Sequence, residues 1–136
     1  MKTHEFLGLD VGKIRTGIAR GNSAAGLAEP LITVKTDSLI EKLEELIDKN
    51  QISAVVIGLP RSLNGNDTAQ TQWVRDWVTK TKQRVPVPFY WQDEALTSNL
   101  AEAQKNLGAK HDTDSLAAAV ILQEFLDTPE VERVIC

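Results

Sequence analysis

The stretch LGLDVGKIRTGIAR, residues Leu7–Arg20, determines how the chain begins to fold. An apolar run ends at Asp10, a glycine follows at Gly12, and a second run resumes at Arg15. This pattern predicts a β-hairpin with strands over 4–11 and 15–21, turned at Gly12 and Lys13. A carboxylate at the end of a buried strand is costly unless something compensates its charge. Asp10 is therefore expected to start the turn, form a salt bridge or hold a cation.

The rest of the chain alternates between strand and helix patterns. A short apolar run, SAVVIGLP, is typical of a strand buried on both faces. We expect strands over 31–35 (after Pro30), 53–60 and 87–94, and helices from Leu39, around Trp73–Val78, over 97–108 and over 113–126. Asp37 or Ser38 is the expected cap of the first helix. The order predicts an α/β fold with a mixed five-stranded sheet and helices on both faces.

Length and composition narrow the protein class. The 136 residues suit one domain, 1–136, with a hydrophobic core, and the lone cysteine, Cys136, excludes a disulfide framework. We find no apolar run of membrane-spanning length and no secretory signal, so the cytoplasm is the expected location. The net charge of −4 argues against a protein that simply coats nucleic acid. It is compatible with an enzyme that gathers carboxylates around metal ions.

Acidic residues stand at the ends of three predicted elements. They are Asp10, the pair Asp93 and Glu94, and the pair Asp112 and Asp114. Strand ends on one side of a sheet meet at the usual ligand crevice of open α/β sheets. Converging carboxylates repel each other unless a cation lies between them, and their hard oxygens suit Mg²⁺ or Mn²⁺. Each position also has a simpler explanation: a turn at Asp10, a loop after 93, or a helix cap at 112 or 114.

Other catalytic motifs are missing from the sequence. It contains no phosphate-binding G-x-x-x-x-G-K-[ST] loop, no G-x-G-x-x-G and no G-x-S-x-G elbow, and its two histidines lack zinc-site spacing. The loop GLPRSLNG, residues 58–65, follows a buried strand. Its amides and Arg61 could contact a phosphate, or the loop could be a plain connection.

Five segments together resemble the YqgF family of the ribonuclease H-like superfamily: LGLDVGKIRTGIA, AEPL, VVIGLPRSLNG, DEALTS and DSLAAAVILQEFL. The resemblance covers nearly the whole chain and implies a ribonuclease H-like fold. It also implies a nuclease that matures the 5′ end of precursor 16S ribosomal RNA, or a Holliday junction resolvase. The family's acidic site residues correspond to Asp10, Glu94 and Asp114. This sequence departs from the family pattern at two positions that concern phosphate contacts. Ala95 stands where the family usually has an arginine, and the first turn reads Gly12-Lys13-Ile14-Arg15 where the family usually has Gly-Thr-Lys-Arg.

Together these observations predict a metal-dependent phosphodiesterase acting on nucleic acid. Asp10, Glu94 and Asp114 would be the catalytic residues and hold one or two Mg²⁺ or Mn²⁺ ions. Lys13, Arg15 and Arg61 would orient substrate phosphates. Precursor ribosomal RNA is the expected partner. Four-way DNA, or a non-catalytic RNA- or ribosome-binding role, is the alternative. The sequence leaves open a monomer or homodimer and gives no reason to expect membrane association.

Overall fold

A computed structural model describes residues 3–62, 64–93 and 112–136. Its centre is a mixed sheet in the order β3-β2-β1-β4-β5-β6. The described elements, in chain order, are β1 (Glu5–Val11), β2 (Arg15–Asn22), β3 (Ala28–Lys35), η1 (Thr36–Ser38), α1 (Leu39–Asn50), β4 (Ile52–Leu59), α2 (Ala69–Thr81), β5 (Phe89–Asp93), α4 (Thr113–Asp127), η3 (Glu130–Glu132) and β6 (Val134–Ile135). The first three strands pair antiparallel, and β1, β4 and β5 are parallel. The α/β class and the mixed character of the sheet are confirmed.

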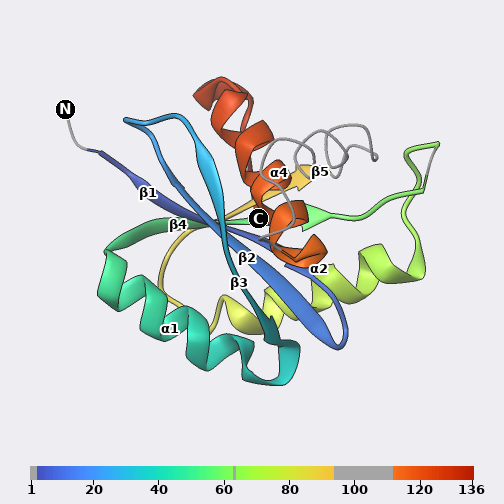
Figure 1. The fold of residues 1–136 in the computed structure, drawn as a ribbon. Coiled ribbons are helices and arrows are strands. Elements are labelled where there is room, and N and C mark those ends of the chain that lie inside the picture. Colours follow the sequence, from blue (N-terminus) through green and yellow to red (C-terminus); the bar gives the residue numbers. More distant parts are fainter. Residues whose placement is uncertain (1–2, 63, 94–111) are drawn as a thin grey trace.

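Helices cover both faces of the sheet, as expected. Figure 1 shows α1 and α2 on one side of the strands and α4 on the other. The larger apolar cluster lies beneath α1 and α2 and includes Leu7, Leu9 and Ile57. The second cluster lies beneath α4, where Phe6 and Phe125 pack with ring centroids 5.4 Å apart. Strand alternation explains why the core is divided into two clusters. The odd-numbered residues of β1 face α1 and α2, and the even-numbered residues face α4.

The predicted strand count and two strand boundaries were wrong. The described part of the sheet has six strands, because Val134–Ile135 pairs antiparallel with β5. A two-residue strand is too short to produce a recognisable alternation. Strand β3 begins at Ala28 and contains Pro30, which lies opposite Ala19 at a register shift. Proline is tolerated there because β3 is at the sheet edge. Strand β5 begins at Phe89, two residues later than expected.

Helix ends are fixed by local hydrogen bonds. Helix α2 begins with a capping box, in which Thr68 and Thr71 bond each other's backbone amides reciprocally. Ser38 holds the expected cap position of α1, but its side chain makes no capping bond. The helix expected over 97–108 lies outside the described residues. Among the helices that the structure describes, none has the length and apolar character needed to span a bilayer.

The C-terminal residue closes the sheet edge. The backbone amide of Cys136 donates to the carbonyl of Phe89 at 2.8 Å, and Lys82 Nζ donates to the carbonyl of Cys136 at 2.9 Å. Burial raises the pKa of the Cys136 thiol to about 12, although Lys82 and Arg75 act in the opposite direction. A thiol with so high a pKa is protonated at neutral pH. Cys136 packs against the larger apolar cluster, which is the source of this burial.

The closest approach between the sheet and α4 occurs at a glycine. A Cβ atom added to Gly17 would lie 1.9 Å from the carbonyl oxygen of Asp114 and 2.8 Å from the amide nitrogen of Ser115. Both atoms belong to the α4 backbone, which cannot turn aside as a side chain can. Only a residue without a side chain permits this contact.

We therefore expect Gly17→Ala to lower the free energy of unfolding by about 3 kcal/mol, the upper end of the range for overpacking. Gly26→Ala is the matched control, because nothing lies within 4 Å of its added Cβ although its φ is +64°. Gly26→Ala should lower the free energy of unfolding by only about 1 kcal/mol, because alanine is disfavoured in a left-handed backbone conformation. Urea unfolding of both variants measures the difference. Equal losses would show that the contact with α4 is unimportant.

Candidate active site

The site begins where β1 ends. Phe6 belongs to the cluster beneath α4, and Leu7, Leu9 and Val11 belong to the opposite one. Alternation therefore directs Asp10 to the α4 face of the sheet. Asp10 lies opposite Gly17 in the antiparallel register of β1 and β2. Its half-buried carboxylate is thus beside the glycine against which α4 is packed.

The start of α4 brings a second carboxylate to the same place. Gly17 contacts the backbone of Asp114, so the first turn of α4 rests on β2 next to Asp10. The Asp114 side chain is 33% exposed and forms an ion pair with Arg15, with Nε and Oδ2 3.2 Å apart. Arg15 is two residues before Gly17 on β2 and therefore shares its face. The structure brings together three of the predicted site residues: Asp10, Asp114 and Arg15.

Asp112 and Asp114 have different roles. Asp112 is the N-cap of α4, and its Oδ1 accepts hydrogen bonds from the Ser115 amide at 2.8 Å and from Thr33 Oγ1 at 2.6 Å. Thr33 lies on β3, so this carboxylate also ties the helix to the sheet edge. The sequence left open which aspartate caps the helix. The structure assigns that role to Asp112 and leaves Asp114 at the site.

Threonines that sequence reasoning missed hold the turn after Asp10. The Gly12 amide donates to the carbonyl of Arg15 at 3.0 Å, and Thr36 Oγ1 donates to the carbonyl of Gly12 at 2.6 Å. The hydroxyl of Thr36 lies 2.9 Å from that of Thr16, which is completely buried. These bonds fix the turn that carries Lys13, whose side chain is exposed. Thr16 is the second residue of β2 and Thr36 the first of η1, and neither position gives a signal of this role from sequence alone.

Arg61 lies beside Asp67 and Asp93. It follows β4, and its Nε lies 3.4 Å from Asp93 Oδ1 and 3.6 Å from Asp67 Oδ1. The Nε atom is buried and has no hydrogen-bond partner within the described part of the chain. Asp67 also pairs with Arg75 at 3.5 Å. A phosphate approaching Arg61 would compete with two carboxylates already beside it.

The third predicted metal ligand, Glu94, lies outside the described residues. Phe89 and Trp91 pack in the cluster beneath α1 and α2 and Tyr90 in the one beneath α4, so β5 alternates as expected up to Trp91. Asp93 is turned towards Arg61. Within residues 3–62, 64–93 and 112–136, no three acidic, histidine or cysteine side chains form a metal-binding group. The two carboxylates of Asp10 and Asp114 nevertheless offer the oxygen chemistry that Mg²⁺ and Mn²⁺ prefer, so these residues fit such an ion.

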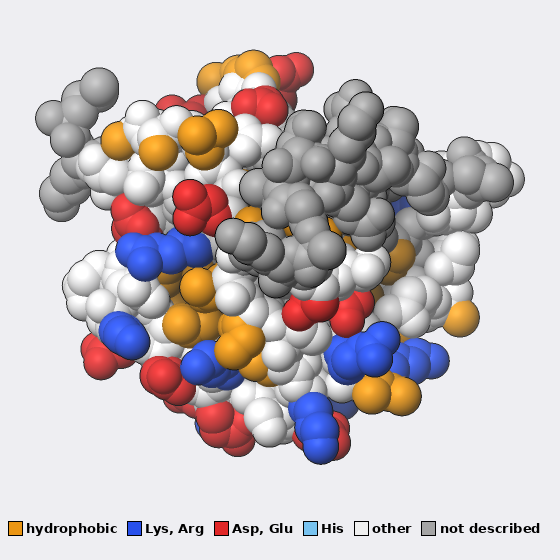
Figure 2. Space-filling view, in the orientation of Figure 1, with side chains coloured by type: hydrophobic (Ala, Val, Ile, Leu, Met, Phe, Trp, Pro, Cys, Tyr) orange, Lys and Arg blue, Asp and Glu red, His pale blue; other side chains and the backbone are white. Residues whose placement is uncertain are grey.

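Charges of both signs are mixed over the described part of the face shown in Figure 2. In the face shown in Figure 2, Lys and Arg side chains lie beside acidic ones and do not gather in one broad basic area. This distribution agrees with the net charge of −4. Binding of a polyanion through a few local contacts suits this surface better than a continuous electrostatic groove.

Comparisons with known proteins show the family of the chain and support its fold. The family model described as "RuvX: Holliday junction resolvase" matches residues 4–128. Two relatives carry the name "Putative pre-16S rRNA nuclease". The one from Gloeothece citriformis (strain PCC 7424) is 36% identical over 138 residues, covering 95% of this chain and 91% of the relative. The one from Sulfurihydrogenibium sp. (strain YO3AOP1) is 37% identical over 129 residues, covering 90% and 89%.

A solved structure supports the fold. The structure titled "T. thermophilus RuvC in complex with Holliday junction substrate" superposes with a TM-score of 0.66, covering 97% of this chain and 99% of that one. The sequence identity is only 16%, so this likeness concerns the fold. The resemblance to the YqgF family and the expected ribonuclease H-like architecture are confirmed.

Two nearby aspartates should respond differently to substitution. Asp112→Ala removes the helix cap and should lower the free energy of unfolding by about 1 kcal/mol. Asp114→Ala removes an ion pair whose arginine is 70% exposed, so its effect should stay below about 0.5 kcal/mol. Urea unfolding of the two variants measures the difference. A larger loss for Asp114→Ala would mean that Asp114 serves the fold rather than the site.

Proposed function

The chain belongs to the RuvX family, and from that premise we propose that it is a metal-dependent nuclease that hydrolyses phosphodiester bonds in precursor 16S ribosomal RNA. One observation carries the proposal: Asp10 lies opposite Gly17, and Gly17 holds the first turn of α4 with Asp114. Two carboxylates from opposite ends of the chain thereby occupy one face of the sheet. The activity belongs to a single nuclease domain over 1–136, and the cytoplasm is the compartment it implies.

Asp10, Asp114 and Glu94 are the residues that would hold Mg²⁺ or Mn²⁺. Glu94 follows β5 in the sequence, and the family resemblance supports including it in the acidic set. The bound ion or ions supply an activated water and stabilise the leaving oxygen of an in-line displacement. Half-burial of Asp10 limits the water that screens its charge, which strengthens attraction for a cation.

Basic residues at the same end of the sheet orient the substrate. Arg15 is already 3.2 Å from Asp114, so a phosphate oxygen bound by its outer nitrogens would lie next to the acidic site. Its planar guanidinium can grip two oxygens, whereas the exposed Lys13 acts as a point charge. At Arg61, whose Nε already lies beside Asp93 and Asp67, a phosphate would compete with these two carboxylates. Such backbone contacts position a strand without reading its sequence.

Four-way DNA is the second candidate substrate. It is supported by the family description and by a fold that matches a resolvase over nearly all of this chain. Cleavage of a precursor 16S ribosomal RNA fragment and of a four-way junction, under the same conditions, tests the choice. Faster cleavage of the RNA supports the main proposal, and faster cleavage of the junction favours the alternative. Cleavage of neither supports a binding role without catalysis.

Metal dependence and the role of Asp10 give one prediction. Cleavage should require Mg²⁺ or Mn²⁺, should stop with EDTA, and should be poor with Ca²⁺, whose coordination is longer and less regular. Asp10→Asn should abolish cleavage while the melting temperature stays near that of the unaltered protein, because the substitution preserves shape and removes a charge. Rate measurements with each ion and a thermal melt provide the check. Equal rates with EDTA would contradict the mechanism.

The neighbours Asp93 and Glu94 give another prediction. Asp93 pairs with Arg61, and strand alternation predicts that Glu94, which lies outside the described residues, faces the α4 side with Asp10 and Asp114. Glu94→Gln should therefore remove nearly all metal-dependent cleavage, and Asp93→Asn should cost far less. Both rates are measured at saturating Mn²⁺ with melting curves as controls. If Asp93→Asn is the inactive variant, the third ligand is Asp93.

A further inference from the structure

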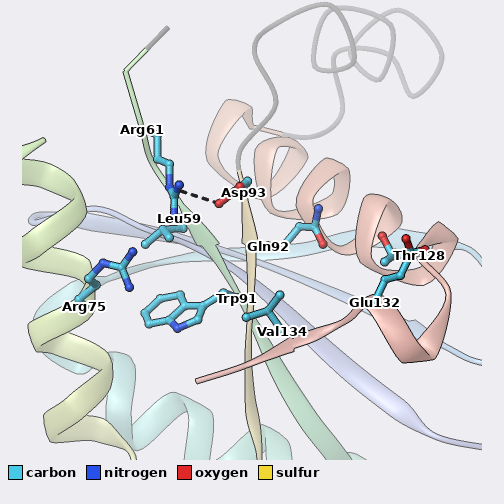
Figure 3. Close-up of a pocket in the computed structure, with 9 residues that line it drawn as sticks. All are labelled: Leu59, Arg61, Arg75, Trp91, Gln92, Asp93, Thr128, Glu132 and Val134. Carbon is cyan, nitrogen blue, oxygen red and sulfur yellow. Dashed lines mark ion pairs between the residues drawn. The ribbon is translucent and has the colours of Figure 1, made fainter. Parts of the chain in front are cut away.

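A pocket opens beyond the carboxyl ends of β4 and β5, separate from the two carboxylates of the site. Its volume is about 370 Å³, within the range of small-molecule sites. Figure 3 shows the residues that surround it, which come from β4, β5, β6, α2 and the segment after α4. They are Leu59, Arg61, Arg75, Trp91, Gln92, Asp93, Thr128, Glu132 and Val134.

An aromatic ring forms one wall of this pocket. The indole of Trp91 lies between Arg75 and Val134 (Figure 3). The guanidinium carbon of Arg75 lies 5.5 Å from the centre of the ring, and Arg75 is itself held by Asp67. The side of Trp91 is also packed against the core, which fixes its orientation. A rigid indole beside a planar guanidinium is a surface on which flat heteroaromatic groups stack.

The charges around the pocket favour a neutral ligand over an anion. Arg61 and Arg75 are the two cations of the lining, and Asp67 contacts both of them. Asp93 and Glu132 add two further carboxylates at the wall. Among the described residues around the pocket, carboxylates therefore outnumber the two arginines, and they would repel a phosphate. An uncharged group with donors and acceptors would find partners in the amide of Gln92 and the carboxylate of Asp93.

We propose that this pocket binds an unpaired nucleobase of the substrate strand, stacked on Trp91 and hydrogen-bonded at its edge by Gln92 and Asp93. The inference rests on the proposed nuclease function, because it identifies the substrate as a nucleic acid with at least one exposed base. A base within a duplex cannot enter such a pocket, so the site selects single-stranded or extruded nucleotides.

The position of the pocket suits this role. Leu9 on β1 is in register with Ile57 on β4, and Ile57 is in register with Trp91 on β5. Strand β1, which carries Asp10, is therefore two strands away from β5, which carries Trp91. At the usual spacing of neighbouring strands, their backbones are about 10 Å apart. Because Asp10 faces the α4 side of the sheet and Trp91 the opposite side, a nucleic-acid strand that places a phosphate at Asp10 and a base against Trp91 would pass over the carboxyl ends of these strands. The pocket would then determine which bond reaches the carboxylates.

The test compares two strands with the same phosphates. The Asp10→Asn protein, which should not cleave, is titrated with a single-stranded RNA of about 12 nucleotides and with an abasic strand of equal length. We expect the RNA to bind roughly 5- to 100-fold more tightly, the contribution of stacking one base. Trp91→Leu should remove most of this difference, and Trp91→Phe should keep much of it. Trp77→Leu is the matched control, because Trp77 packs against the same core but does not line the pocket.

Cross-linking locates the base without any change at Trp91. An RNA carrying 5-iodouridine is irradiated on the Asp10→Asn protein, and the modified peptide is identified by mass spectrometry. Attachment at Trp91 supports the proposal even if Trp91→Leu does not fold. Equal affinity for RNA and abasic strand, or attachment only elsewhere, overturns the pocket while the nuclease function stands. A protein that binds neither strand overturns both proposals.

Discussion

The contact between Gly17 and the backbone of Asp114 is the constraint on which the site depends. A helix can approach a sheet this closely only where a strand residue has no side chain, and the added Cβ would lie 1.9 Å from a carbonyl oxygen. The same glycine lies opposite Asp10 on the neighbouring strand. The same contact therefore serves packing and chemistry. It holds α4 against the sheet, and it also brings the first turn of α4 next to the Asp10 carboxylate on β1.

Strand alternation lets β1 serve the core and the site together. Leu7, Leu9 and Val11 face the larger cluster and are almost fully buried, which fixes the register of the strand. A shift of one residue would exchange every side chain between faces, so the apolar positions also determine where Asp10 points. The charge is tolerated because it lies at the strand's end and is only half-buried. The burial of apolar neighbours thus orients a residue that would be costly elsewhere in the strand.

Much of the fold could be predicted from the sequence because its strands and helices have regular patterns of apolar residues. The hairpin around Gly12, the buried strand β4 and the last helix follow from periodicities that any protein would have to satisfy. Pro30 within β3 was missed because only an edge position tolerates it, and edge positions are known only once the sheet is assembled. The ion pairs of Arg61 depend on how the connection between β4 and α2 folds and on its contact with the end of β5, which sequence spacing does not encode. Glu94 keeps its predicted role without a structural test.

Charge compensation within the site explains how an acidic chain can act on a polyanion. Arg15 is paired with Asp114, and Arg61 lies between Asp67 and Asp93, so these cations are not surplus charge. A phosphate at the outer nitrogens of Arg15 would share this guanidinium with the Asp114 carboxylate, which weakens its net contribution. A cation bound by Asp10 and Asp114 would compete with Arg15 for the same carboxylate and so release the guanidinium towards the phosphate. Metal and substrate would then favour each other's binding, and stacking on Trp91 would add affinity that needs no excess of positive charge.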